Sequence, residues 1–242
     1  MESSKFMVPL QRNYNTMSRK KILHFGLNRS GTNYLKQLLE RHFNVGFLNV
    51  EEERGHPLHK HFRIYDNKEL IGRPNFMNDQ VFKSFQAFEA SVFSNKKPDM
   101  YVVISKDPYS WHLSYSRWGE KNNWPESPHP YILEYNEFYG KWLEFSGQTN
   151  RIVFIRYIDL LKHPRRELKK LRDRFDLEVT KKLNSAGRIR KVPMSHRFSS
   201  KKARYYTQQA YLDEFSREAL AQLNMHLNRE VAGQLGYKIY EK

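Results

Sequence analysis

A short loop bounded by Gly26 and Gly31 limits how the first part of this chain can fold. The loop reads Gly-Leu-Asn-Arg-Ser-Gly-Thr from residue 26 to residue 32. The apolar run before it predicts a strand, and the apolar residues after it recur at helical spacing. Glycines let the backbone turn with its N–H groups inward, and a following helix N-terminus adds positive potential. The loop is therefore predicted to bind an anion. The alternative is a plain glycine turn capped by Ser30 or Thr32.

The remainder of the chain alternates between predicted strands and helices. Apolar runs predict strands at 21–25, 45–49, 100–105 and 152–155. Amphipathic patterns predict helices at 34–43, 79–93, 109–118, 132–145, 164–175 and 213–234, the last stopping at Gly236. Residues 56–74, 122–130 and 182–204 are expected to be irregular. This alternation predicts an α/β fold with a mainly parallel sheet. Residues 1–20 are predicted to be a flexible tail and residues 21–242 a single domain.

Composition removes several classes of protein. The 242 residues contain 39% hydrophobic and 14% aromatic residues, enough for a packed core, and no cysteine, which excludes disulfides, thiolate nucleophiles and cysteine-based zinc sites. No stretch approaches the roughly 20 apolar residues of a membrane span, and the polar N-terminus lacks the apolar core of a signal peptide. A cytoplasmic protein is therefore expected.

The net charge of +16, from 42 Lys and Arg against 26 Asp and Glu, favours anionic ligands. Nucleic acid is the usual partner of such a protein, and a phosphorylated nucleotide or an acidic acceptor is the second. The basic residues are spread along the whole chain rather than gathered in one arm. This spread argues against a stable nucleic-acid partner, although a basic, non-catalytic nucleic-acid-binding protein stays an alternative.

The position of the cation separates this loop from that of nucleoside triphosphatases. Their loop reads G-x4-G-K-[ST], with a lysine that reaches the γ-phosphate and a hydroxyl that binds Mg²⁺. Here Thr32 stands at the lysine position, and the cation is Arg29, inside the loop. Such a loop suits a shorter 5′ group and needs no metal if the protein supplies the charge. A P-loop nucleotide or metabolite kinase is the alternative.

Three motifs in order resemble those of sulfotransferases that use PAPS (3′-phosphoadenosine 5′-phosphosulfate). The run from Gly26 to Leu35 resembles their 5′-phosphosulfate loop, P-[KR]-S-G-T-[TN]. Lys106-Asp107-Pro108, with Ser114 eight residues after Lys106, is similar to their 3′-phosphate motif, which usually begins with Arg. Arg156-Tyr157-Ile158-Asp159-Leu160 is similar to their R-Y-E-D-L run. Their C-terminal basic motif is not clear, because Val192 follows Arg190-Lys191 where a glycine is expected.

The resemblance covers about residues 20–175 and implies a P-loop-type three-layer α/β domain with a central, mainly parallel sheet flanked by helices. It implies PAPS as co-substrate, PAP as product, and no metal. The acceptor is expected to be a small molecule, a carbohydrate or a lipid, with an acidic one included. The implied cofactor-binding residues are Arg29, Ser30, Gly31, Thr32, Asn33, Lys106, Ser114, Tyr157, Arg190 and Lys191.

Sulfuryl transfer needs a group that stabilises the leaving phosphate and a base that takes the acceptor's proton. Arg29 is predicted to be the first, because its forked donors suit a phosphosulfate. For the base, the chain offers His56, His59 and His61 within one segment. Lys60-His61 resembles a Lys-His pair of many relatives and favours His61, whereas other relatives use a Glu. A metal site on His59 and His61, or a solvated loop, are the alternatives.

Other residues have two interpretations each. Tyr157 is expected near the adenine, as the resemblance implies, or at the edge of the core. The basic residues between 182 and 204 either hold an acidic acceptor or the 3′-phosphate, or form a solvated surface. The aromatic residues of 111–139 either line an acceptor site or form core; they are Trp111, Tyr115, Trp118, Trp124, Tyr131, Tyr135, Phe138 and Tyr139.

Overall fold

The computed structural model describes residues 19–52, 55–64, 82–94, 97–124, 126–127, 129–180 and 200–241. Arg190 and Lys191 lie outside the described residues, and so do residues 1–18 of the predicted tail and all of residues 65–81 and 181–199.

The described strands form a four-stranded parallel sheet in the order β2-β1-β3-β4. The strands are β1 (Lys20–Phe25), β2 (Val45–Phe47), β3 (Met100–Ser105) and β4 (Ile152–Arg156). All four predicted strands are confirmed, with the second shorter than expected. Every residue of β3 is buried, as its unbroken apolar run predicts for a central strand of a parallel sheet.

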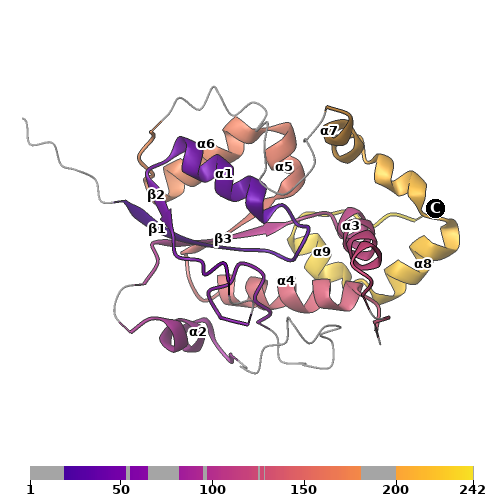
Figure 1. The fold of residues 1–242 in the computed structure, drawn as a ribbon, viewed down its shortest axis with the longest axis horizontal. Helices are drawn as coiled ribbons and strands as arrows, with labels where there is room; N and C mark the ends of the chain where they lie inside the picture. Colours follow the sequence, from indigo (N-terminus) through magenta and orange to yellow (C-terminus); the bar gives the residue numbers. More distant parts are fainter. Residues whose placement is uncertain are drawn as a thin grey trace, which may run out of the picture.

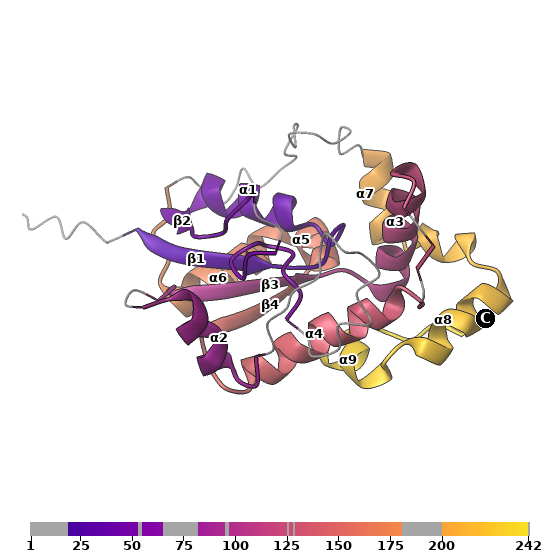
Figure 2. The same ribbon diagram turned by 60° about the horizontal axis from the view of Figure 1, so that its bottom comes forward.

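Helices cover both faces of the sheet and give three layers (Figure 1). α1, α5 and α6 lie on one face, and α2, α4 and α9 lie on the other, as the turned view also shows (Figure 2). The predicted three-layer α/β fold is therefore confirmed. The helices are α1 (Thr32–His42), α2 (Phe85–Val92), α3 (Pro108–Lys121), α4 (Ile132–Ser146), α5 (Tyr157–Lys162), α6 (Pro164–Phe175), α7 (Ser200–Thr207), the 3₁₀ turn η4 (Ala210–Glu214), α8 (Arg217–His226) and α9 (Arg229–Gln234).

Aromatic side chains fill the layer between the sheet and α4. Trp142 is fully buried, and its ring centroid lies 4.6 Å from that of Phe25 and 5.9 Å from that of Phe88. Such rings bury large areas and prefer offset or edge contacts of this kind. This packing fixes α4 beneath the strands β1 and β3.

The order of the strands places three chain segments at one edge of the sheet. The chain leaves β1 toward β2 on one side, and β3 lies on its other side, so the direction of winding reverses between β1 and β3. Ligands of open parallel sheets bind outside the carboxyl ends of the strands at this point. Gly26 follows β1, Lys106 follows β3 and Tyr157 follows β4, so all three come together there.

The structure differs from the expected helices in four places. The helix predicted at 79–93 begins only at Phe85, where Ser84 caps it. The helix α5 was not predicted, and residues 200–207 form α7 where an irregular segment was expected. The predicted long helix at 213–234 is broken into η4, α8 and α9, because the side chains of Ser216 and Asn228 each cap a new helix start.

Candidate active site

The loop after β1 has the backbone of an anion cradle. Arg29 and Gly31 both have positive φ, 72° and 102°, which turns the chain sharply into α1. A Cβ on Gly26 would lie 2.5 Å from Ser30 Oγ and 2.8 Å from the Ile104 carbonyl oxygen, so only glycine fits there. Among the described residues no side chain caps α1 and its first turn holds no acidic residue. Its first N–H groups and its positive end are thus available to an anion.

Arg29 and Ser114, which the sequence assigns to the 5′ and the 3′ anion respectively, are in contact. Arg29 is exposed, and its Nε donates to Ser114 Oγ at 3.4 Å, across the space between the loop and α3. Ser30 and Thr32 are buried and form the floor of the loop, whereas Asn33 is exposed and its Oδ1 accepts from Lys60 Nζ at 2.8 Å. The structure therefore brings the loop residues and Ser114 into one place.

Lys106 is a buried cation at the end of β3. Its side chain is 2% exposed, and its Nζ donates to Tyr206 Oη at 3.3 Å and lies 4.5 Å from the centroid of that ring. Within the described part of the chain, no carboxylate forms an ion pair with it. Burial, with help from the nearby cations Arg29 and Lys202, holds the pKa of Lys106 well below its ordinary value. An uncompensated buried cation is costly, and an anionic ligand would relieve that cost.

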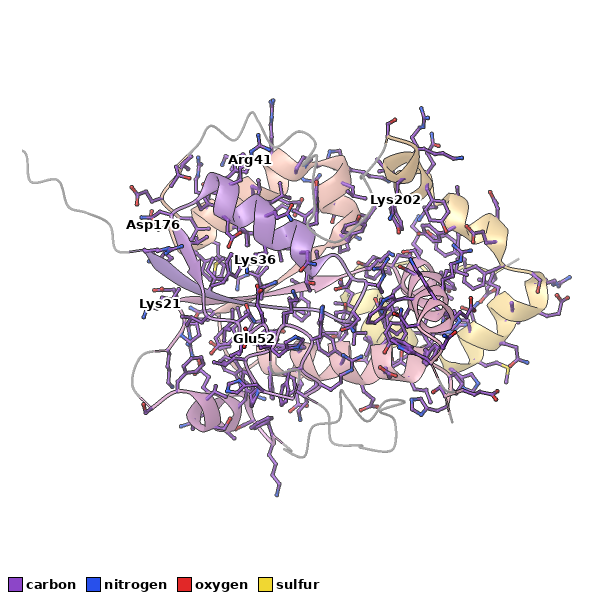
Figure 3. All side chains as sticks on the ribbon, in the orientation of Figure 1. Lys21, Lys36, Arg41, Glu52, Asp176 and Lys202 are labelled. Atoms are coloured by element: carbon purple, nitrogen blue, oxygen red, sulfur yellow. The ribbon has the colours of Figure 1, made fainter. Side chains whose placement is uncertain are left out.

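Tyr206, the residue that Lys106 contacts, lines a pocket of about 610 Å³, whereas Lys106 itself is not among its lining residues. The loop, α3 and α7 line it, and its cations are Arg29, Arg117, Lys121 and Lys202. Figure 3 shows Lys202 pointing from α7 toward α3. Arg117 is paired with Glu214, so part of its charge is already balanced. The field of the pocket is positive and suits a ligand with several negative charges.

Tyr157 packs against the loop. It is 9% exposed, and a Cβ placed on Gly31 would lie 2.5 Å from its ring. Its ring centroid lies 6.0 Å from that of Tyr34, on α1, and 5.4 Å from that of Tyr206, on α7. Tyr157 is thus largely buried core that supports the loop, and its predicted place beside an adenine stays a prediction.

Of the three histidines, His61 has the closest link to the loop. Its Nδ1 lies 2.6 Å from the Gly26 carbonyl oxygen, an acceptor, so Nδ1 carries the proton of the neutral ring and Nε2 keeps a lone pair. Burial holds its pKa well below the ordinary value, and His59, Lys60 and Arg63 lower the pKa further. The ring is therefore neutral with a lone pair on Nε2, as a general base needs, but its depressed pKa makes it a weaker base than an ordinary imidazole.

The other two histidines have structural bonds. His56 Nδ1 accepts from the Leu58 N–H at 3.0 Å, and His59 Nδ1 accepts from the His61 N–H at 3.2 Å. Among the described residues, no group of three or more His, Asp or Glu is placed to hold a metal ion. Nor is any described helix long and apolar enough to cross a membrane.

The aromatic residues of α3 and α4 belong mainly to the core, and several hold the site's backbone in place. Trp111 Nε1 donates to the Asn28 carbonyl at 3.0 Å, and Tyr135 Oη donates to the Lys106 carbonyl at 2.9 Å. Both rings are fully buried. Of the two alternatives, core therefore holds for Trp111 and Tyr135, whereas Trp118 lines the pocket.

Sequence reasoning missed Tyr206 and Arg117 and left Lys202 among a group of undifferentiated basic residues. Tyr206 lies 100 residues from the lysine that it contacts, so no local pattern links them. The one available signal was the basic and aromatic run Lys-Lys-Ala-Arg-Tyr-Tyr at residues 201–206.

Comparison with known proteins gives similarity at the level of solved structures. No family model matches the sequence, and no curated protein matches it. Mouse sulfotransferase SULT7A1 complexed with PAP is similar to 89% of this chain and 88% of its own, with 14% sequence identity and a TM-score of 0.44. The sulfotransferase domain from the curacin biosynthetic pathway is similar to 64% of this chain and 58% of its own, with 19% identity and a TM-score of 0.38.

Proposed function

We propose that this chain transfers a sulfuryl group from PAPS to the hydroxyl or amine of an acceptor and releases PAP. The observation that carries the proposal is that Arg29 and Lys202 line one pocket, while Lys106, bonded to Tyr206 of the same pocket, is buried with its pKa depressed by burial and by these two cations. Such a cluster is costly in the free protein and is stabilised by a ligand that brings several negative charges.

Two features favour a nucleotide with anionic groups at both its 3′ and 5′ positions. The loop presents the start of α1 and Arg29 to one anion. We assign Lys106 and Ser114 to the second anion, because Tyr206 is hydrogen-bonded to both and so links them. Thr32 stands where a triphosphatase would have its lysine, which disfavours a γ-phosphate. PAPS and PAP have charges at both positions, whereas AMP lacks the 3′ charge.

In the proposed transfer step, Arg29 and His61 have complementary roles. The acceptor oxygen or nitrogen attacks the sulfur in line as the bond from sulfur to the bridging oxygen breaks. Arg29 balances the negative charge that develops on the departing phosphate, and its forked donors suit this task. The acceptor's proton passes to His61 Nε2, the nitrogen that the bond from Nδ1 to Gly26 leaves unprotonated.

The acceptor is proposed to be a small molecule, a carbohydrate or a lipid. The pocket adds Arg117 and Lys121 to the cations beside the loop, so an acidic acceptor fits its charge. The amount of positive charge exceeds what a neutral phenol or alcohol needs. We therefore place acidic acceptors first in the panel for the activity assay.

Calorimetry with PAP, ADP and AMP in the absence of Mg²⁺ tests the nucleotide. PAP should bind at least tenfold tighter than AMP, because the 3′-phosphate gains charge-assisted bonds that AMP cannot make. Lys202→Ala should weaken PAP binding, whereas Lys201→Ala serves as the matched control, because Lys201 is exposed on the same helix and does not line the pocket. Lys106→Ala should weaken PAP and leave AMP almost unchanged.

Three results would contradict the proposal. Equal affinity for PAP and AMP would remove the 3′-phosphate site. A Mg²⁺-dependent preference for ATP would support the kinase alternative. Binding of DNA or RNA that falls steeply with salt, without nucleotide binding, would support the nucleic-acid-binding alternative. If PAP does bind, transfer of labelled sulfate from PAPS into the acceptor panel identifies the second substrate.

A further inference from the structure

A buried ion pair lies beside the segment that contains His61. The side chains of Arg63 and Glu134 are each 1% exposed, and Arg63 Nη2 lies 3.0 Å from Glu134 Oε2. The same Nη2 donates to Tyr115 Oη at 3.1 Å, and that hydroxyl donates to Glu134 Oε2 at 3.2 Å. The pair links Arg63, which follows the histidine segment 56–61, to Glu134 on α4, 71 positions along the chain. The bridging hydroxyl of Tyr115 comes from α3.

Stability alone is a weak reason for such a pair. Removing two charges from water costs about as much as their attraction returns, and apolar side chains of similar volume are often as good or better in this place. The surroundings here are largely aromatic: Tyr115 stacks on Trp111 with 4.8 Å between ring centroids, and His129 Nε2 lies 4.0 Å from Glu134 Oε1. A pair of apolar side chains would fit the same core. What it could not supply is the set of directed bonds that the guanidinium makes.

One of those bonds reaches the candidate base. Arg63 Nη1 donates to the His61 carbonyl oxygen at 2.8 Å. The same helix, α3, holds the anion loop through Trp111, which donates to the Asn28 carbonyl at 3.0 Å. Side chains of α3 therefore contact both the loop and, through Arg63, the histidine segment. This arrangement sets the position of His61 relative to the loop.

We infer that Arg63, held by Glu134 and Tyr115, is a positioning residue that fixes the backbone at His61, so that its ring keeps the bond from Nδ1 to Gly26 and its Nε2 stays unprotonated. The inference rests on the proposed function for its catalytic meaning. The coupling between Arg63 and His61 is a property of the free protein and can be measured without any substrate.

Charges facing His61 support the same link. Burial lowers the pKa of His61 most, the bond to Gly26 raises it, and the nearby His59, Lys60 and Arg63 each lower it further. The loss of the Arg63 cation therefore shifts the His61 pKa upward. A purely structural role for Arg63 would change the melting temperature but would leave the tautomer of a correctly folded His61 unchanged.

The test uses the full chain with ¹⁵N-labelled histidine and the double variant Arg63→Met/Glu134→Leu, which removes both charges while keeping the volume apolar. NMR of the ring nitrogens, assigned with His61→Gln, should show the Nδ1–H tautomer in the wild type and a titration midpoint well below 6.5. In the double variant the fixed tautomer is expected to be lost. PAP affinity should stay within about twofold. With an acceptor from the panel, turnover should fall about 10- to 100-fold.

Arg63→Lys keeps the charge but cannot make the same forked bonds. It should reproduce the loss of tautomer and turnover, and it decides the question if the double variant does not fold. Removal of the exposed pair Lys169 and Asp173 by alanine is the control and should change nothing. A folded double variant or Arg63→Lys variant with wild-type tautomer and turnover would overturn the inference. A wild type that fails to bind PAP would instead overturn the proposed function, and the NMR result would still stand.

Discussion

Replacement of Gly31 by alanine tests whether the loop has the strained geometry on which an anion site depends. Gly31 has φ of 102°, a region that costs a residue with a Cβ about 1–2 kcal/mol. The added Cβ would also lie 2.5 Å and 2.9 Å from two carbons of the Tyr157 ring, so a largely buried ring must move. Overpacking of this kind costs about 1–3 kcal/mol. The two effects together predict a loss of about 2–5 kcal/mol in the free energy of unfolding.

Urea unfolding, followed by circular dichroism, measures this loss. Gly233→Ala is the matched control, because Gly233 lies in α9 and its added Cβ would meet nothing within 4 Å. That change should be neutral or stabilise by up to about 1 kcal/mol. A double-mutant cycle with Tyr157→Ala separates the two costs, since the contact with the ring disappears while the backbone strain stays.

The reasoning fails on either of two results. A Gly31→Ala variant destabilised by less than about 0.5 kcal/mol would mean that the loop does not hold this conformation. Additive effects of Gly31→Ala and Tyr157→Ala would mean that the ring does not pack on the loop. The expected coupling is about 1–3 kcal/mol, with the double variant less unstable than the sum of the single ones.

Three further predictions concern the chemistry. Arg29→Ala should lower turnover of PAPS by about 10²-fold or more with the fold retained, because one charge-stabilising donor is lost; stopped assays of PAP release measure it, and near-normal turnover would refute the role. His61→Ala should keep PAP binding and lose about 10²- to 10⁴-fold in turnover, whereas His56→Ala, the control, should stay active. A larger loss of turnover in His56→Ala than in His61→Ala would show that His61 is not the base. PAP affinity should fall as pH rises through the depressed pKa of Lys106, because the bound phosphate favours the protonated lysine. Calorimetry in buffers of different ionisation enthalpy should then show proton uptake on binding, and Lys106→Met should flatten the profile; an unchanged profile in that variant would contradict the assignment.

Much of the site was predictable because its signals are local. The glycines of the loop, the apolar run at 100–105 and the strand at 152–155 each depend on neighbours within a few residues, and the strands form as expected. The alternation of strands and helices predicts a parallel sheet, and in such a sheet the carboxyl ends meet at one edge. The meeting of the loop with Lys106 and Tyr157 follows from that rule.

Local signals also misled where capping competes with periodicity. The apolar spacing of residues 213–234 predicts one long helix, but the caps at Ser216 and Asn228 divide it. Periodicity reports which face is buried and does not report where the chain bends to follow the core.

The sequence by itself determined the glycine-bounded loop between a strand and a helix, the type of sheet and the presence of a histidine segment after the second strand. Only the tertiary structure decided which histidine bonds to Gly26, that α7 brings Tyr206 onto Lys106 from 100 residues away, and that Arg63 pairs with Glu134. The physical reason is the distance along the chain over which each kind of interaction acts. Turn chemistry and hydrophobic spacing act over a few residues, whereas a buried charge finds its partner through the packing of helices that are distant in sequence.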